Sequence, residues 1–219
     1  MRKMYSANGT TQTSNRNGSN PESLSNTFTE NENGEKQLSE PSANQTPYIE
    51  IKKADARHIP LPDKSVDLII TSPPYWRKRD YGISDQIGQE KTPREYVDAI
   101  IEALGEWRWV LRPTGSVFLN IGDTYWKRSL TGIPGRIEAQ ARDDDWIIRN
   151  RIIWAKDGGM PEPAQNRLAN RHEYILHLAV THDYYYDMFG YSELFGTGAN
   201  PGDVWHIGLR RNTVLQDLA

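Results

Sequence analysis

A short apolar run that ends at two consecutive prolines constrains this chain more than any other feature. Residues 66–71 read Val-Asp-Leu-Ile-Ile-Thr, and Ser72-Pro73-Pro74-Tyr75 follows directly. A run of this length with branched residues is typical of a strand buried in a parallel sheet. Proline lacks a backbone N–H, holds φ at about −65° and disfavours helical geometry in the residue before it. The sequence therefore predicts a central strand followed by a rigid, extended corner.

Strand and helix patterns alternate after this corner. Thr92-Pro93-Arg94-Glu95 has the signature of a helix start, with Thr92 as the N-cap, and apolar residues follow at helical spacing until Pro113. Further segments favour strands at 116–121, from Trp146 to Trp154 and from Tyr174 to Val180, and a short helix around 136–142. This alternation predicts an α/β domain with a mixed or mostly parallel sheet and flanking helices.

The first 47 residues differ in composition from the rest of the chain. Residues 1–47 are rich in Ser, Asn, Thr and Glu and contain few large apolar side chains. Such a segment cannot bury enough surface to offset the entropy lost on ordering. We therefore predict a disordered, low-complexity tail at 1–47 and a folded part at 48–219.

Composition excludes several kinds of site. The sequence has no cysteine, which rules out disulfides, thiolate metal sites and a cysteine nucleophile. Methylation of cytosine at C5 requires thiolate attack on the ring, so that activity is excluded too. The formal net charge is −3, so nucleic acid must be contacted by local clusters of Lys and Arg. No apolar run approaches the roughly 18 residues of a membrane helix. No apolar stretch follows Arg2 and Lys3, so we do not expect a secretory signal, and we expect a cytoplasmic protein.

The proline corner suits methyl transfer to an exocyclic amine. Ligands of open α/β sheets lie beyond the carboxyl ends of the strands, which is where this corner falls. An exocyclic amine is a poor nucleophile because its lone pair is delocalised into the ring. The Ser72 hydroxyl and the Pro73 carbonyl are suited to accept its two hydrogens, which frees the lone pair. Tyr75 offers an aromatic surface for a base that has left the duplex.

Several segments in order resemble the β-group of bacterial DNA amino-methyltransferases. The resemblance rests on Asp55 through Tyr75, Leu111 through Asp123, His172 through Ile175, and Gly202 through Trp205, and it covers about residues 50 to 207. It implies a partial Rossmann-like methyltransferase sheet with flanking helices. It also implies site-specific methylation of double-stranded DNA with S-adenosyl-L-methionine as the cofactor, as part of a restriction-modification system.

The resemblance assigns roles to single residues. It implies that Ser72, Pro73, Pro74 and Tyr75 form the catalytic corner that holds the target amine. It places Asp55 near the adenosine of the cofactor, and we expect Thr71, at the strand end, to contact the cofactor as well. A serine in first position favours cytosine N4 over adenine N6, although serine-led adenine enzymes also occur in this group. The reaction requires no metal.

One motif of the group is not found in this sequence. Members with this motif order carry a Phe-x-Gly-x-Gly loop, which folds around the methionine part of the cofactor, after the segment that corresponds to Gly202 through Trp205. The residues from His206 to Ala219 contain no such loop. We expect a second polypeptide to supply it, as in split methyltransferases. The alternative is an inactive, truncated remnant that acts at most as a DNA-binding or regulatory protein.

Two groups of cations are candidates for DNA contacts. Arg77, Lys78 and Arg79 follow the corner, where the phosphates of a flipped nucleotide would pass, and Arg167 and Arg171 lie in a long loop between two predicted strands. The neighbouring pair His172-Glu173 has no further residues at metal-ligand spacing, and we expect a structural role for it. Methylation of RNA or of protein glutamine by a related corner is a third hypothesis, which the leading serine and the arginine-bearing loop disfavour.

Overall fold

The computed structural model describes residues 3–5, 28–30, 36–38, 49–156, 158, 163–195, 200 and 202–207. The chain divides into two compact units, of which one comprises residues 1–7 and 52–219 and the other residues 8–51. The smaller unit contains an antiparallel pair, β2 (Phe28–Glu30) and β3 (Lys36–Leu38). Most of residues 1–47 lie outside the described residues, so disorder in that segment stays a prediction.

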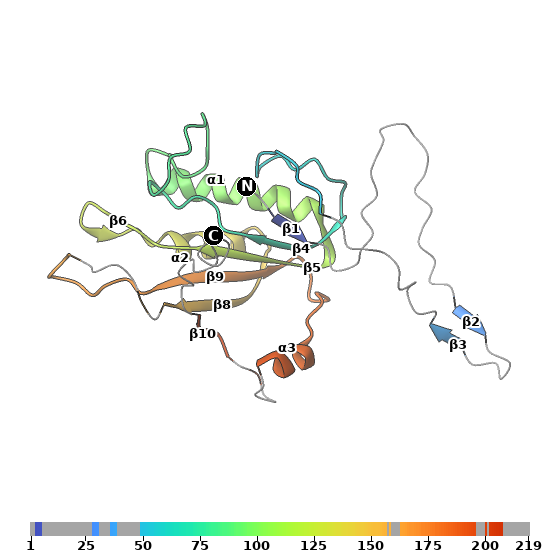
Figure 1. Cartoon of the computed structure of the whole chain (residues 1–219). Coiled ribbons are helices and arrows are strands. Elements are labelled where there is room, and N and C mark those ends of the chain that lie inside the picture. Colours follow the sequence, from blue (N-terminus) through green and yellow to red (C-terminus); the bar gives the residue numbers. More distant parts are fainter. Residues whose placement is uncertain are drawn as a thin grey trace, which may run out of the picture. The chain divides into compact units, whose positions relative to one another are not determined.

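The larger unit contains the remaining strands and all three helices of the described residues (Figure 1). In chain order they are β1 (Lys3–Tyr5), β4 (Val66–Thr71), α1 (Pro93–Val110), β5 (Leu111–Ile121), β6 (Tyr125–Trp126), β7 (Ser129–Leu130), α2 (Ile133–Asp143), β8 (Ile147–Ala155), β9 (His172–Ala179), α3 (Met188–Phe195) and β10 (Val204–His206). None of the helices in the described part of the chain is long and apolar enough to span a bilayer.

Six strands form one mixed sheet in the order β1-β4-β5-β9-β8-β10. The pairs β4–β5 and β8–β10 are parallel, whereas β9 is antiparallel to both β5 and β8. Strands β4, β5 and β8 therefore run in the same direction, and their carboxyl ends meet the amino end of β9 at one edge of the sheet. The predicted α/β architecture is confirmed, and its mixed sheet matches the expectation.

Helix α1 begins as the sequence predicts and ends at Val110, before Pro113. The Thr92 side chain accepts a hydrogen bond from the Glu95 backbone N–H at 3.2 Å, and Pro93 occupies the first turn, where its missing N–H does no harm. The Glu95 carboxylate accepts from the backbone of Lys91, not from that of Thr92 as in a standard capping box. The buried face of α1 joins α2, β4, β5 and β9 in one hydrophobic core.

Strand β5 begins directly after α1 and continues through Pro113, where the sequence predicted only the end of a helix. Glycine is required at position 115, because a Cβ there would lie 2.8 Å from the carbonyl oxygen of Asp67 on β4. The close approach lets β4 and β5 pair as far as Thr71 and Leu119, so both strands reach the same edge of the sheet.

Candidate active site

The proline corner lies beyond the carboxyl end of β4. Thr71, the last residue of β4, pairs with Leu119, and Ser72 directly after it is exposed. Among the described residues, no donor reaches the carbonyl of Pro73. In contrast, the carbonyl of Pro74 accepts a hydrogen bond from the buried hydroxyl of Tyr96 at 3.0 Å. The corner is thus fixed through Pro74, while the hydroxyl of Ser72 and the carbonyl of Pro73 keep acceptor positions for a ligand.

Two glycines allow the corner to pack closely. Gly88 has a φ of +107°, and a Cβ there would lie 3.0 Å from the Cβ of Pro74. At Gly122, just after β5, an added Cβ would lie 2.7 Å from Cε2 of Tyr75. The next residue, Trp76, is buried and donates its indole N–H to the carbonyl of Glu90 at 2.9 Å. These contacts hold the corner and the start of the following loop in one position.

The hydroxyl of Tyr75, which follows β4, donates to a carboxylate on β9, beyond the intervening strand β5. It lies 2.7 Å from Oε2 of Glu173, and the same oxygen accepts from Nδ2 of Asn120 at 2.9 Å. The other oxygen of Glu173 forms an ion pair with Nζ of Lys156, which follows β8. Three side chains therefore meet at the Glu173 carboxylate: Tyr75 from the corner after β4, Asn120 near the end of β5 and Lys156 just after β8. This carboxylate lies at the sheet edge where ligands of α/β proteins bind.

Burial and the shared carboxylate set the protonation states in this network. Burial raises the pKa of Tyr75, and the hydrogen bond to Glu173 and the negative charge of Glu173 raise it further. Burial alone would raise the pKa of Glu173, but hydrogen bonds from Lys156, Tyr75 and Asn120 outweigh burial and lower that pKa. At neutral pH the phenol is therefore a donor and the carboxylate is ionised.

Asn120 has a buried acceptor without a partner. Its Oδ1 is buried and accepts no hydrogen bond from the residues that the structure describes, because its Nδ2 is directed to Glu173. An unsatisfied buried acceptor is unfavourable by about 1–3 kcal/mol, so the atom calls for a donor such as an ordered water or a ligand. Asn120 is the last residue but one of β5. Its Oδ1 is a candidate ligand contact that the sequence analysis did not single out.

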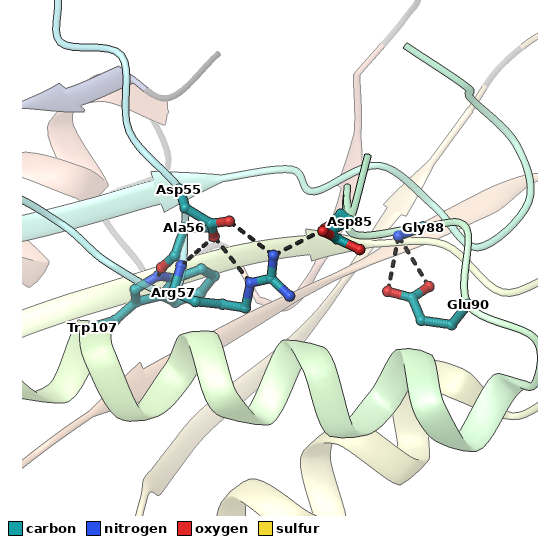
Figure 2. Close-up of polar contacts among 7 residues, drawn as sticks. All are labelled: Asp55, Ala56, Arg57, Asp85, Gly88, Glu90 and Trp107. Carbon is teal, nitrogen blue, oxygen red and sulfur yellow. Dashed lines mark hydrogen bonds and ion pairs between the residues drawn. The ribbon is translucent and has the colours of Figure 1, made fainter. Parts of the chain in front are cut away.

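The Asp55 carboxylate accepts hydrogen bonds from Arg57 and forms an ion pair with it (Figure 2). Its Oδ1 accepts from the backbone N–H and Nε of Arg57 at 2.8 and 3.0 Å, and its Oδ2 accepts from Nη2 at 2.8 Å. Hydrogen bonding by the Arg57 side chain lowers the pKa of Asp55 to about 2. Arg57 also donates to the carbonyl of Asp85 at 2.9 Å, which links this segment to the loop after the corner. Three of roughly four acceptor positions on the carboxylate are used, so one remains for a ligand.

The three predicted DNA-contacting cations after the corner are all exposed. Arg77 adopts a left-handed backbone with a φ of +56°, and its N–H donates to the carbonyl of Gly88 at 2.7 Å. Its guanidinium lies 5.0 Å from the ring centre of Trp76 and donates to the carbonyl of Lys91. Lys78 closes a turn onto the carbonyl of Tyr75 at 3.0 Å. Arg77 is thus held in place, in the loop that leaves the corner.

The long loop between β8 and β9 contacts a hairpin that the sequence did not predict. Strands β6 and β7 form this hairpin, and the guanidinium of Arg167 lies 3.7 Å from the ring centre of Tyr125 on it. Trp126, the next residue, makes an edge-to-face contact with Trp76, with 5.6 Å between ring centres. Arg171 is exposed, and its carbonyl accepts from the backbone N–H of Lys156 at 2.8 Å. The hairpin thus lies between the predicted corner and the predicted DNA-binding loop.

Comparison with known proteins identifies related sequences. Residues 66–211 match the N6/N4 methyltransferase family, described as DNA methylase. The type II methyltransferase M.Cfr9I of Citrobacter freundii is 31% identical over 181 residues, which cover 68% of this chain and 60% of that protein. The type II methyltransferase M.MwoI of Methanothermobacter wolfeii is 44% identical over 120 residues, which cover 53% of this chain and 18% of that protein. The chain thus matches at most about three fifths of these relatives' length.

Solved structures of similar fold include the PvuII DNA methyltransferase, which is cytosine-N4-specific. It superposes with a TM-score of 0.56 at 19% identity over 70% of this chain and 54% of that one. TTHA0409 of Thermus thermophilus, a candidate DNA modification methylase complexed with S-adenosyl-L-methionine, gives a TM-score of 0.51 at 24% identity over 69% of this chain and 66% of that one. At these identities the likeness establishes the fold alone.

Proposed function

Because the chain belongs to the N6/N4 methyltransferase family of DNA methylases, we propose that it supplies the target-base pocket of a DNA amino-methyltransferase. The substrate is double-stranded DNA, from which one base is flipped into the corner at residues 72–75. The cofactor is S-adenosyl-L-methionine, which provides an electrophilic methyl group when it is bound. The protein acts in the cytoplasm as the modification partner of a restriction system, a role supported by its similarity to type II methyltransferases.

The observation that carries this proposal is the carbonyl of Pro73, which receives no donor from the described residues and lies beside the exposed Ser72. An exocyclic amine carries two hydrogens, and the corner offers two acceptors for them. Hydrogen bonds to both favour a tetrahedral nitrogen, whose lone pair can attack a methyl group. Tyr75 supports the ring of the flipped base, and stacking of this kind contributes on the order of 1–3 kcal/mol. The rigid Pro73-Pro74 backbone positions the acceptors before the base arrives.

The residues proposed to contact the cofactor are Asp55 and Thr71. Asp55 retains one acceptor position after its three hydrogen bonds to Arg57, and its side chain is 43% exposed. Its low pKa keeps it ionised, so it suits a donor such as an amine or hydroxyl of an adenosine. Thr71 is half-buried at the end of β4, directly before the corner. These features fit the role of holding the adenosine part of S-adenosyl-L-methionine.

We also propose that residues outside these 219 supply the glycine-rich loop for the methionine part of the cofactor, on a second polypeptide if the enzyme is split. No Phe-x-Gly-x-Gly motif occurs in the 219 residues of this sequence. Isothermal titration calorimetry on the chain by itself is expected to show weak or no binding of S-adenosyl-L-methionine. Binding should become measurable when the chain is co-expressed with a neighbouring gene product that carries the motif. Tight binding by the chain alone would contradict the need for a partner.

The proposed target is cytosine N4, with adenine N6 as the second choice. The leading residue of the corner, Ser72, supports this preference. Mass spectrometry of nucleosides from DNA methylated by the protein distinguishes the two, because N4-methylcytosine and N6-methyladenine differ in mass. A methylated base in RNA, or methylated glutamine in protein, would overturn the DNA assignment. If no acceptor is methylated with any partner, the alternative of an inactive DNA-binding remnant takes its place.

A substitution at the corner tests the assignment of the pocket. Ser72→Ala removes one acceptor for the target amine and is expected to reduce the turnover number more than the affinity for DNA. Tyr75→Ala is expected to weaken capture of the flipped base by on the order of 1–3 kcal/mol, which appears in the KM for DNA. Normal methylation by both variants would mean that the pocket lies elsewhere.

A further inference from the structure

We propose that Glu173 is a positioning residue of the target-base pocket, which acts through Tyr75 and Asn120. This inference rests on the proposed function and adds a residue to it. From the sequence we expected a structural role for the pair His172-Glu173, and no residue could be named as its partner. In the structure Glu173 lies 98 positions from Tyr75 along the chain, yet its carboxylate accepts the Tyr75 hydroxyl.

The position of Glu173 follows from the sheet register. Strand β9 is antiparallel to β5 and β8, so the amino end of β9 lies beside their carboxyl ends. Glu173 is the second residue of β9 and pairs with Trp154, whereas Asn120 pairs with Ile175 two residues further along. Side chains two residues apart on a strand share one face. This register lets the Glu173 carboxylate reach both Asn120 and the corner after β4.

The ionised carboxylate of Glu173 serves three contacts of this arrangement at once. An ionised carboxylate accepts hydrogen bonds only, so it can receive the Tyr75 hydroxyl, the Asn120 amide and the Lys156 ammonium together. Lys156 compensates the charge at a half-buried site, where an unpaired carboxylate would be costly. The contacts keep Glu173 ionised at neutral pH, because they lower its pKa against the effect of burial.

Glu173 restricts the Tyr75 ring together with Gly122. The hydroxyl is held at 2.7 Å by the carboxylate, and the ring edge lies where a Cβ on Gly122 would come within 2.7 Å of Cε2. The hydrogen bond fixes the hydroxyl end of the ring, and the absence of a side chain at Gly122 leaves the space that the ring edge occupies. A ring fixed before the base arrives loses less conformational entropy on stacking. The expected effect of Glu173 is therefore on capture and alignment of the base, without contact to the base.

The same carboxylate orients the Asn120 amide. Since Nδ2 donates to Glu173, Oδ1 is the atom left without a partner in the described part of the structure. Rotation of the amide would place Oδ1 against the carboxylate, where two acceptors repel each other. Glu173 thus fixes an unsatisfied acceptor beside the Tyr75 hydroxyl. A donor on the incoming base can satisfy it.

A third contact links Glu173 to the predicted DNA-binding loop. Lys156 pairs with Glu173 through its side chain, and its backbone N–H donates to the carbonyl of Arg171 at 2.8 Å. These two contacts join the first and last residues of the loop that carries Arg167. Glu173 therefore connects the ends of this loop to the Tyr75 ring, which is proposed to receive the base.

The test compares four variants: Glu173→Ala, Glu173→Gln, Tyr75→Phe and the double variant Tyr75→Phe/Glu173→Ala. Each is measured in the form of the enzyme that methylates DNA, either the chain alone or the chain with its second polypeptide. Glu173→Ala is expected to lower kcat/KM for DNA about 10- to 100-fold, since misplacing a reacting group by about 1 Å has an effect of this size. Glu173→Gln keeps an acceptor for Tyr75 and should recover activity to within several-fold of wild type. The double variant should lose less activity than the product of the two single losses, because both changes remove the Tyr75–Glu173 hydrogen bond, whereas only Glu173→Ala also releases the Asn120 amide.

Glu138→Ala is the matched control. Like Glu173, Glu138 forms an ion pair with a basic side chain, that of Arg151, but Glu138 lies on helix α2. This variant should leave kcat/KM unchanged. A second readout does not depend on turnover: 5-iodouracil, placed at the methylated position of a duplex and irradiated, cross-links to an aromatic ring stacked on it. The cross-link to Tyr75 should fall several-fold in Glu173→Ala, measured at saturating protein.

The outcomes separate the inference from the proposed function. If the wild-type protein methylates DNA and Glu173→Ala shows the same activity and the same cross-linking, the inference is overturned but the proposed function stands. Multiplicative losses from Tyr75→Phe and Glu173→Ala would have the same consequence, since they would show that Glu173 does not act through the Tyr75 hydroxyl. If Glu173→Ala does not fold, Glu173→Gln and Tyr75→Phe still decide, because retained activity in Tyr75→Phe contradicts the inference. A wild-type protein that methylates no DNA overturns the proposed function and the inference with it.

Discussion

At the scale of single residues, the corner depends on how closely the backbone approaches it. Gly122 follows β5 and faces the Tyr75 ring, whereas Gly105 lies in α1 with no atom within 4 Å of an added Cβ. The two glycines therefore serve different purposes. Gly122 makes room for the ring that is proposed to stack on the base, and Gly105 is a helix position at which alanine is intrinsically favoured.

Gly122→Ala is expected to displace the Tyr75 ring and to reduce DNA methylation about 10-fold or more, because its Cβ would lie 2.7 Å from Cε2 of that ring. Gly105→Ala is the matched control and should stabilise the protein by about 0.5–1 kcal/mol with unchanged activity. Thermal unfolding and initial rates measured on both variants check the prediction. Equal activity of the two would show that the ring position is unimportant.

The residues of the corner could be predicted from the sequence because they are adjacent in the chain. Ser72 through Tyr75 is a local pattern, and each proline acts on its immediate neighbours. Glu173 could not be assigned to the corner in this way, because its contact depends on the direction and register of β9. A polar residue near the end of an apolar strand, as at Asn120, was the one available signal, and it does not identify a partner.

At the scale of elements, hydrophobic periodicity predicted the strands and helices of the core, including α1 and its Thr92 cap. The β6–β7 hairpin was missed for a physical reason. Its two turn residues, Lys127 and Arg128, both have positive φ, of 50° and 65°. Turns of this type usually carry Asn, Asp or Gly, and neither residue gives that signal. The antiparallel insertion of β9 between β5 and β8 was also not predictable, because pairing is not encoded locally.

The pairing of β5 with β9 is expected to make stability depend on pH. His177 on β9 is 1% exposed, lies 3.0 Å from Oγ of Ser116 and stacks on Phe118. Burial, with a smaller effect from the charge of Arg149, lowers the pKa of His177 to about 4. Between this value and the ordinary value of about 6.5, the unfolded chain binds a proton that the folded chain does not. Stability from this residue is therefore complete above about pH 6.5 and is lost as the pH falls toward 4.

His177→Gln should remove this pH dependence. The difference in unfolding free energy between wild type and variant is expected to narrow by up to about 3 kcal/mol between pH 7 and pH 4, because glutamine does not titrate. Urea unfolding at several pH values, with the same ionic strength throughout, measures this difference. A constant difference across the range would mean that His177 titrates with an ordinary pKa in the folded protein.

At the scale of the whole molecule, the described sheet brings the predicted corner and one predicted DNA-binding loop to the same edge. The strands β4, β5 and β8 end there, and the loop before α1, the β6–β7 hairpin and the loop before β9 extend from that side of the sheet (Figure 1). The sequence predicted this arrangement in part, since carboxyl ends of parallel strands share an edge. It could not predict that Tyr125 and Trp126 would lie between Arg167 and the corner.

The last prediction concerns the cations after the corner. If Arg77, Lys78 and Arg79 contact phosphates, the triple variant Arg77→Asn/Lys78→Ala/Arg79→Ala should weaken binding to all DNA sequences alike. Asparagine is chosen at position 77 because it tolerates the left-handed backbone found there. The slope of log affinity against log salt concentration should also fall, by about 0.9 for each lost contact.

A control removes cations near the amino ends of the strands, at the opposite edge of the sheet. Lys64 precedes β4 and Arg142 lies in the last turn of α2, before β8. The variant Lys64→Asn/Arg142→Ala should change the slope little for each cation removed, because these residues lie away from the proposed DNA path. Fluorescence anisotropy with the assembled enzyme at several salt concentrations gives both slopes. If the triple variant loses affinity only for the cognate site and its salt slope is unchanged, the residues after the corner read bases, since base contacts release few counterions.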